Sequence, residues 1–180
     1  MVQVSSVFTI GHSTRSLDEF IEILKSFRIQ TLVDVRSFPG SRRYPHFNRE
    51  ALQGSLGAVD IDYAHLPELG GRRRPLPDSL NMTWRNESFR GYADYMETDD
   101  FGEGIRRLLK VARDQRTVIM CSEAVWWRCH RSMISDYLKA KGVEVIHILA
   151  AGKSAAHPYT SAARIVNGEL SYRGVLETGT

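Results

Sequence analysis

The chain has 180 residues, of which 42% are hydrophobic and 25% are charged, and its formal net charge is +3. These proportions exclude a largely disordered chain, and the length fits one domain, residues 1–180, with its own core. No apolar run approaches the roughly 20 residues of a membrane helix, and the first ten residues lack the pattern of a secretory leader. We therefore expect no membrane partner and a cytoplasmic location, where the two cysteines stay reduced.

The N-terminal segment predicts a strand, a helix and a second strand. The short apolar run Val7–Ile10 ends at a glycine, and Ser16 can cap an amphipathic helix that extends to Phe27. Thr31–Arg36 reads as a second buried strand. Two strands joined in this way are expected to be parallel, with a right-handed crossover.

The middle of the chain predicts fewer regular elements. A weak helix is expected near residues 49–56 and a short strand over 61–66, followed by a long loop over 67–88. Loops of that length in compact domains are usually functional or disordered. The run Arg72-Arg73-Arg74 favours a functional role for this one.

The second half repeats the strand and helix pattern. Helices are predicted near 89–96 and 100–114, a strand at 117–121, a helix ending near Gly142 and a strand at 144–149. Asn167-Gly168 between two β-prone segments indicates a hairpin. The order predicts an α/β fold: a single three-layer domain with a mostly parallel central sheet, helices on both faces and a C-terminal β-hairpin.

The run from Cys121 to Arg131 is the most informative stretch, because it concentrates reactive side chains between a predicted strand and a predicted helix. Ligands of α/β sheets bind at this strand edge, where helix N-termini favour anions. Cys121 is either a nucleophile or a buried apolar thiol. Glu123 is either a general acid or base or a structural carboxylate. Arg131 in a first helical turn suggests a bound anion or a buried carboxylate such as Asp34.

Polar residues also end the other predicted strands, and parallel strands bring such ends together. Asp34 and Arg36 can alternatively form a structural pair within one strand. The interpretation favoured is an enzyme, of the class of cysteine-dependent transferases or hydrolases, that acts without a cofactor on a nucleotide, nucleic acid or other phosphate-bearing anion. The predicted catalytic residues are Cys121, Glu123 and His12, and the predicted substrate-binding residues are Ser13, Arg36, His65, Glu68, Arg128 and Arg131.

Two other classes of function stay open. A nucleic-acid-binding or DNA-repair accessory module would use the arginines at 72–74 together with stacking aromatic side chains. A metal-binding protein would use Cys121, Cys129 and His130, although the two cysteines are spaced more widely than paired zinc ligands. The oligomeric state is not indicated. The aromatic residues considered for stacking are Trp84, Tyr92, Tyr95, Trp126 and Trp127.

Five segments together match the pattern of a known family: Thr9–Ser13, Leu32–Pro39, His65 with Glu68–Gly71, Phe89–Met96, and Met120–Glu123 with Arg128–Arg131. On these segments the whole chain resembles the domain of unknown function 488 family. The resemblance implies that family's α/β fold and no particular reaction. The chain is also faintly similar to rhodanese-like domains, in which an Asp-Val-Arg strand end precedes a reactive cysteine; here Cys121 and Arg128 are one residue further apart than in the related phosphatase loop.

Overall fold

The computed structural model describes residues 3–174, so the two ends of the predicted domain, residues 1–2 and 175–180, lie outside the described residues. The strands are β1 (Ser6–Gly11), β2 (Thr31–Asp34), β3 (Asp62–His65), β4 (Thr117–Cys121), β5 (Glu144–Ala150), β6 (Lys153–Ala156), β7 (Arg164–Val166) and β8 (Glu169–Ser171). The helices are α1 (Leu17–Ser26), α2 (Arg49–Gly57), α3 (Glu87–Tyr95), α4 (Asp99–Asp114) and α5 (Arg131–Ala140), and the short 3-10 turns are η1 (Pro45–Phe47), η2 (Pro67–Leu69) and η3 (Trp126–Arg128).

The central sheet has the order β3-β2-β4-β1-β5-β6. Its first five strands are parallel and β6 is antiparallel to β5, while β7 and β8 form the separate C-terminal hairpin. The predicted α/β fold with a mostly parallel sheet and a final hairpin is confirmed. The sequence prediction missed β6, whose four residues are small or polar and exposed. Within residues 3–174, every helix is too short or too polar to traverse a lipid bilayer.

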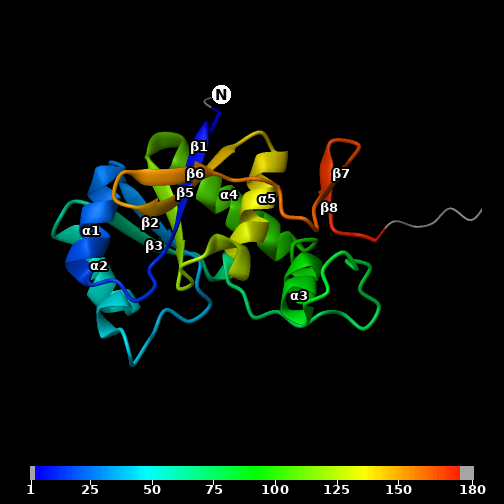
Figure 1. Cartoon of the computed structure of the whole chain (residues 1–180), viewed down its shortest axis with the longest axis horizontal. Coiled ribbons are helices and arrows are strands. Elements are labelled where there is room, and N and C mark those ends of the chain that lie inside the picture. The colour runs from blue at the N-terminus through cyan, green and yellow to red at the C-terminus, as the bar shows by residue number, and fades with distance from the viewer. Residues whose placement is uncertain (1–2, 175–180) are drawn as a thin grey trace, which may run out of the picture.

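Helices cover both faces of the sheet (Figure 1). Phe20 and Leu24 of α1 and Leu52 of α2 pack on one face, in a core that includes Ile10 and Met120. On the other face, the apolar residues of α4 and α5 pack against Val33, Ile119 and Val145. Burial on both faces explains why the parallel strands are continuous apolar runs rather than alternating ones.

The connections of the sheet place a crevice at the carboxyl end of β4. The chain leaves β1 and β2 toward α1 and α2 on one face, whereas it leaves β4, which lies between them, toward α5 on the other face. Adjacent strands whose helices lie on opposite faces leave their C-terminal ends uncovered, and ligands of open α/β sheets bind at such a point. The crevice therefore opens where β1, β2 and β4 end.

The segments that follow β1 and β4 remain hydrogen-bonded beyond the sheet. His12 N donates to the Cys121 carbonyl over 2.9 Å, and Ser13 N donates to the Ser122 carbonyl over 3.0 Å. A Cβ atom on Gly11 would lie 1.6 Å from the Glu123 carbonyl oxygen. Gly11 thus lets the loop after β4, not a ligand, approach the end of β1.

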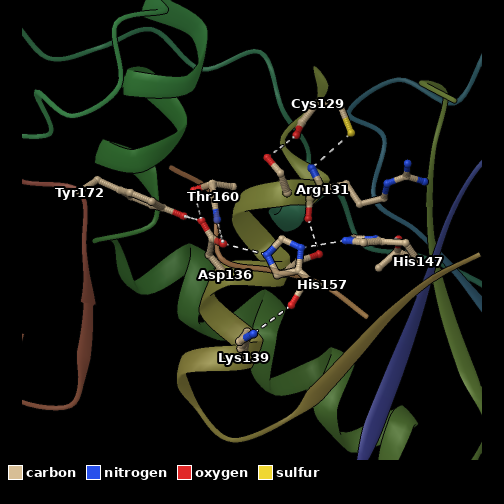
Figure 2. A network of polar contacts seen from close by, with 11 residues as sticks. Cys129, Arg131, Asp136, Lys139, His147, His157, Thr160 and Tyr172 are labelled. Carbon is tan, nitrogen blue, oxygen red and sulfur yellow. Dashed lines mark hydrogen bonds and ion pairs between the residues drawn. The ribbon is translucent and has the colours of Figure 1, made fainter. Parts of the chain in front are cut away.

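A buried polar network connects α5 with β5 and the C-terminal segment (Figure 2). The Asp136 carboxylate accepts hydrogen bonds from His157 Nε2 at 2.8 Å, from the Thr160 backbone at 2.9 Å and hydroxyl at 2.6 Å, and from the Tyr172 hydroxyl at 2.7 Å. His157 Nδ1 lies 2.8 Å from His147 Nε2. Because a buried carboxylate is costly unless its lone pairs are satisfied, these donors fix the segment after β6 against the helix.

We expect Gly11→Ala to displace the loop after β4 and to destabilise the protein by roughly 2 kcal/mol or more, because the new methyl group clashes with backbone rather than with a flexible side chain. Urea unfolding measures this change. The matched control is Gly54→Ala, since a Cβ on Gly54 in α2 meets nothing within 4 Å. Alanine is favoured in helices, so this control should be neutral or stabilising. Equal stabilities of the two variants would contradict the packing described.

We also expect stability to fall as the pH drops below about 6.5. Burial lowers the pKa of His147 from 6.5 to about 2, and burial lowers the pKa of His12 and of His130 to about 4. The unfolded chain takes up protons at these histidines before the folded protein does. The stabilisation is therefore complete above pH 6.5 and is lost toward lower pH, by up to about 1.4 kcal/mol per pH unit for each histidine.

Urea unfolding between about pH 7 and pH 5 tests this expectation, because that window lies above the range in which most carboxylates titrate. His147→Gln keeps a hydrogen-bonding side chain and cannot titrate, so its stability should depend less steeply on pH. A wild-type free energy of unfolding that stays constant across the window would show that these histidines are not held neutral.

Candidate active site

A pocket of about 630 Å³ lies in the crevice at the ends of β1, β2 and β4. Its volume is in the range of small-molecule sites. Five of the residues predicted for the site line it, and they come from segments more than one hundred positions apart: His12, Ser13, Arg36, Cys121 and Glu123. The structure therefore brings together these five side chains, while their chemical roles stay predictions.

The two cysteines form a close pair beside the pocket. Both line it, although Cys121 is 2% and Cys129 8% exposed, and their Sγ atoms are 3.0 Å apart. The hydrogen bond from the Cys129 thiol lowers the pKa of Cys121 to about 7, with help from the positive charge of Arg131. The same bond, together with burial, raises the pKa of Cys129 well above its usual value. Cys121 is thus the more acidic thiol of the pair and Cys129 the less acidic one.

Arg131 is buried beneath the loop that follows Cys121, where only 2% of it is exposed. Its Nη2 donates to the carbonyls of Glu123 at 3.3 Å and Ala124 at 3.4 Å, while its Nε and Nη1 have no hydrogen-bond partner in the part of the chain described. Figure 2 shows its guanidinium turned away from Asp136, the carboxylate of the same helix. A buried cation without a carboxylate partner favours an anion nearby, and the positive charge of Arg131 accordingly contributes to the lowered pKa of Cys121.

The suggestion that Asp34 pairs with Arg131 is wrong. Asp34 instead holds Arg36 through two hydrogen bonds, 2.9 Å from Nε and 2.7 Å from Nη2. Arg36 Nη2 also donates to the Phe47 carbonyl at 2.7 Å, and the Tyr63 hydroxyl donates to Asp34 at 2.5 Å. The sequence also allowed Asp34 and Arg36 to form a structural pair with each other, and the geometry agrees with this alternative. Arg36 nevertheless lines the pocket with a guanidinium fixed in place.

His12 is an uncharged hydrogen-bond acceptor toward Arg36. Its Nδ1 lies 2.8 Å from the Ser13 carbonyl, which can only accept, so the proton is on Nδ1 and Nε2 carries a lone pair. Arg36 Nη1 lies 3.4 Å from that Nε2, and the ring stacks on Phe47 with centroids 4.3 Å apart. Because burial lowers the pKa of His12 to about 4, the ring is neutral at pH 7, so it is no general acid and only a weak base.

Ser13 and Glu123 both line the pocket, Ser13 with an unusual backbone conformation and Glu123 with an exposed side chain. Ser13 has a positive φ of 53°, a conformation that costs free energy and that often occurs at functional sites. The Glu123 side chain is exposed, and its carboxylate makes no hydrogen bond or ion pair with any described residue. Glu123 is therefore free to meet a ligand, whereas its carbonyl helps to hold Arg131.

Three predicted substrate-binding residues do not line the pocket. His65 Nε2 binds the Arg36 carbonyl at 2.7 Å, and Glu68 forms an ion pair with Arg107 of α4 at 3.0 Å. Arg128 is exposed on η3. The strand ends therefore converge for β1, β2 and β4 but not for β3, because β3 is the edge strand and the turn at Pro67 carries Glu68 toward α4. Arg131 is a fourth predicted residue that does not line the pocket: its side chain lies beneath the loop, and its backbone N–H donates to Cys129 Sγ.

Other pocket residues were not among those predicted for the active site. Ser37 and Tyr44 line the cavity, as do Arg72 and His130, which the sequence suggested only for nucleic-acid binding and metal binding; Arg72 has a positive φ of 61°. The sequence signal that could have indicated these residues is the pair Gly70-Gly71. A Cβ on Gly71 would lie 2.8 Å from His130 Nδ1, so the loop can pack this closely only with glycine there. Close packing at these glycines places Arg72, which follows them, at the pocket.

The cysteines and His130 do not make a metal centre. Within residues 3–174 no group of three or more His, Cys, Asp or Glu side chains is placed to hold a metal ion. His130 Nε2 is engaged by the Val35 carbonyl at 2.9 Å, so this nitrogen is not a free ligand. The metal-binding alternative receives no support from the geometry.

Comparison with known proteins bears on the family alone. No curated protein and no solved structure matches the chain significantly. The model of the family described as Domain of unknown function DUF488 matches residues 16–138, which is most of the chain and includes β2, β4 and the loop that joins the two cysteines. The chain belongs to the DUF488 family.

Proposed function

We propose that this protein is a cysteine-dependent enzyme, a transferase or hydrolase, in which the Cys121 thiolate attacks a small anionic substrate bound in the pocket. The observation that carries the proposal is the placement of Cys121 in the pocket wall with the Cys129 thiol 3.0 Å away. A thiolate is the nucleophilic form of cysteine. A pKa of about 7 keeps a large fraction of Cys121 in that form at neutral pH.

An anionic substrate fits the charges around the pocket. Arg36 and Arg72 both line it, while His12 is neutral and adds no charge of its own. Arginine binds phosphate and carboxylate groups through two parallel hydrogen bonds. The volume of about 630 Å³ suits a ligand of nucleotide size. Phosphate-bearing small molecules are therefore the substrate class that we favour, in a cytoplasmic setting that keeps both thiols reduced.

The remaining side chains suggest a division of roles. The exposed carboxylate of Glu123 can donate or accept a proton at the leaving group, whereas the neutral His12 orients Arg36 through its Nε2. Arg36 orients the anion because Asp34 and the Phe47 carbonyl hold it rigidly. A rhodanese-like or phosphatase-like loop is less favoured, because Arg128 lies outside the pocket and the carbonyls after Cys121 face Arg131.

The second candidate is a nucleic-acid-binding module without catalysis. Its support is Phe38, which is 76% exposed and lines the same pocket as Arg72. Trp127 is also 54% exposed, whereas Tyr92 is buried in the core and Trp126 stacks on His147. Such a module would bind a polynucleotide with an affinity that falls steeply with salt, and binding would survive Cys121→Ser.

Alkylation by two reagents of different charge tests the proposed function. We expect iodoacetate, an anion, to react with Cys121 faster relative to neutral iodoacetamide than it does with a free thiol such as N-acetylcysteine, because the pocket attracts the carboxylate. Peptide mass spectrometry should place the label on Cys121, and Cys121→Ser should abolish it. A rate ratio equal to that of the free thiol would contradict an anion-binding pocket, and an unreactive Cys121 would contradict a nucleophile.

Matched variants locate the charge that is responsible. Arg72→Gln should reduce the preference for iodoacetate several-fold, because Arg72 lines the pocket. Arg74→Gln removes an equal charge from the same loop but from a residue outside the pocket wall, and it should leave the preference nearly unchanged. Equal effects of the two substitutions would show that only the general charge of the loop matters.

A further inference from the structure

The second cysteine has no task in the proposed reaction beyond a hydrogen bond. Cys129 lines the same pocket as Cys121, with the two Sγ atoms 3.0 Å apart, and the Arg131 backbone N–H donates to Cys129 Sγ at 3.3 Å. A disulfide bond requires about 2.05 Å between sulfur atoms. Only about one ångström of movement therefore separates the reduced pair from a covalent link.

The two thiols are also chemically unequal. Cys121 is held as the thiolate beside the positive charge of Arg131, whereas Cys129 keeps its proton in a buried position. Cysteines that oxidise reversibly combine a thiolate that an oxidant can reach with a neighbouring thiol that resolves the product. The pocket supplies access for a small oxidant, and the buried sulfurs exclude a protein thiol from direct contact.

We propose that Cys121 and Cys129 form a redox-active pair that is oxidised to a disulfide by small hydroperoxides. The Cys121 thiolate attacks one peroxide oxygen, the O–O bond breaks, and the departing alkoxide or hydroxide takes a proton to leave as alcohol or water. Cys121 is then a sulfenic acid. Cys129 attacks that sulfur, the S–O bond breaks, and hydroxide leaves as water with the Cys129 proton. In total, two thiols and one hydroperoxide give one disulfide, one alcohol or water and one water.

The surrounding structure favours this second step. The Ser132 hydroxyl donates to the Cys129 carbonyl at 2.9 Å and fixes Cys129 at the start of α5. Because resolution is intramolecular, it competes effectively with further oxidation of the sulfenic acid. Disulfide formation also removes the nucleophile, so it reversibly stops any chemistry that depends on the Cys121 thiolate.

Exposure of the reduced, folded protein to hydrogen peroxide tests the pair. We expect the intact mass to fall by two hydrogens, with no dimer on a non-reducing gel, and dithiothreitol to restore both the mass and the alkylation of Cys121. The chain has only two cysteines, so an intramolecular disulfide can join only this pair. A wild-type protein that instead gains oxygen atoms at Cys121, or that forms disulfide-linked dimers, would overturn the proposal.

Two variants separate this inference from the proposed function. Cys129→Ser should still be alkylated at Cys121, but peroxide should convert it to a sulfenic acid that dimedone traps and then to products with two or three added oxygens. Cys121→Ser should react more slowly with peroxide than the wild type and form no intramolecular disulfide, because burial still raises the pKa of Cys129. If wild-type Cys121 is alkylated with the expected preference for anions but no disulfide forms, this inference fails alone. If the disulfide forms and the preference for anions is absent, the proposed function fails alone. Circular dichroism checks that each variant is folded.

Discussion

The burial of the Arg131 guanidinium without a carboxylate partner is the constraint on which the site depends. The charge lies at the start of α5, where the positive end of the helix dipole makes a cation unfavourable, and among residues 3–174 the guanidinium hydrogen-bonds only two loop carbonyls. Such a position is tolerable when an anion is close. The positive charge lowers the pKa of Cys121, so a Cys121 thiolate is the anion that this guanidinium would favour. The loop after β4, whose carbonyls bind Arg131, and the cysteine pair thus depend on the same buried charge.

The rest of the fold fixes this arrangement in place. Asp136 is one turn beyond Arg131 on α5 and ties the helix to His157, which in turn bonds to His147 of β5. Trp126, from the cysteine loop, stacks on His147 with ring centroids 4.5 Å apart and planes within 5° of parallel. The loop therefore rests on the same buried network that anchors the C-terminal segment. Gly11 also lets this loop pack closely against β1, because the absence of a Cβ leaves room for the Glu123 carbonyl.

The sequence allowed much of the fold to be predicted, since apolar runs of strand length alternate with amphipathic helical segments. Residues directly after β1, β2 and β4 were correctly expected at one sheet edge, because parallel strands end together. The partner of Arg131 could not be predicted, since Asp34 sits two positions before a competing Arg36 in the same segment. The strand order could not be predicted either. Because β3 is the edge strand, Glu68 lies away from the pocket. Arg72 reaches the pocket through loop packing, and the pair Gly70-Gly71 is the only sign of that packing in the sequence.

Whether Cys129 and Arg131 favour the thiolate form of Cys121 is tested most directly by the ultraviolet absorbance of the thiolate as a function of pH. The wild-type titration should have its midpoint near pH 7. Cys129→Ala, which removes the donor, should shift the midpoint upward toward the ordinary value of about 8.5, and Cys129→Ser, which keeps a hydroxyl donor, should shift it less. A wild-type midpoint at or above that ordinary value, or equal midpoints in all three proteins, would contradict the account.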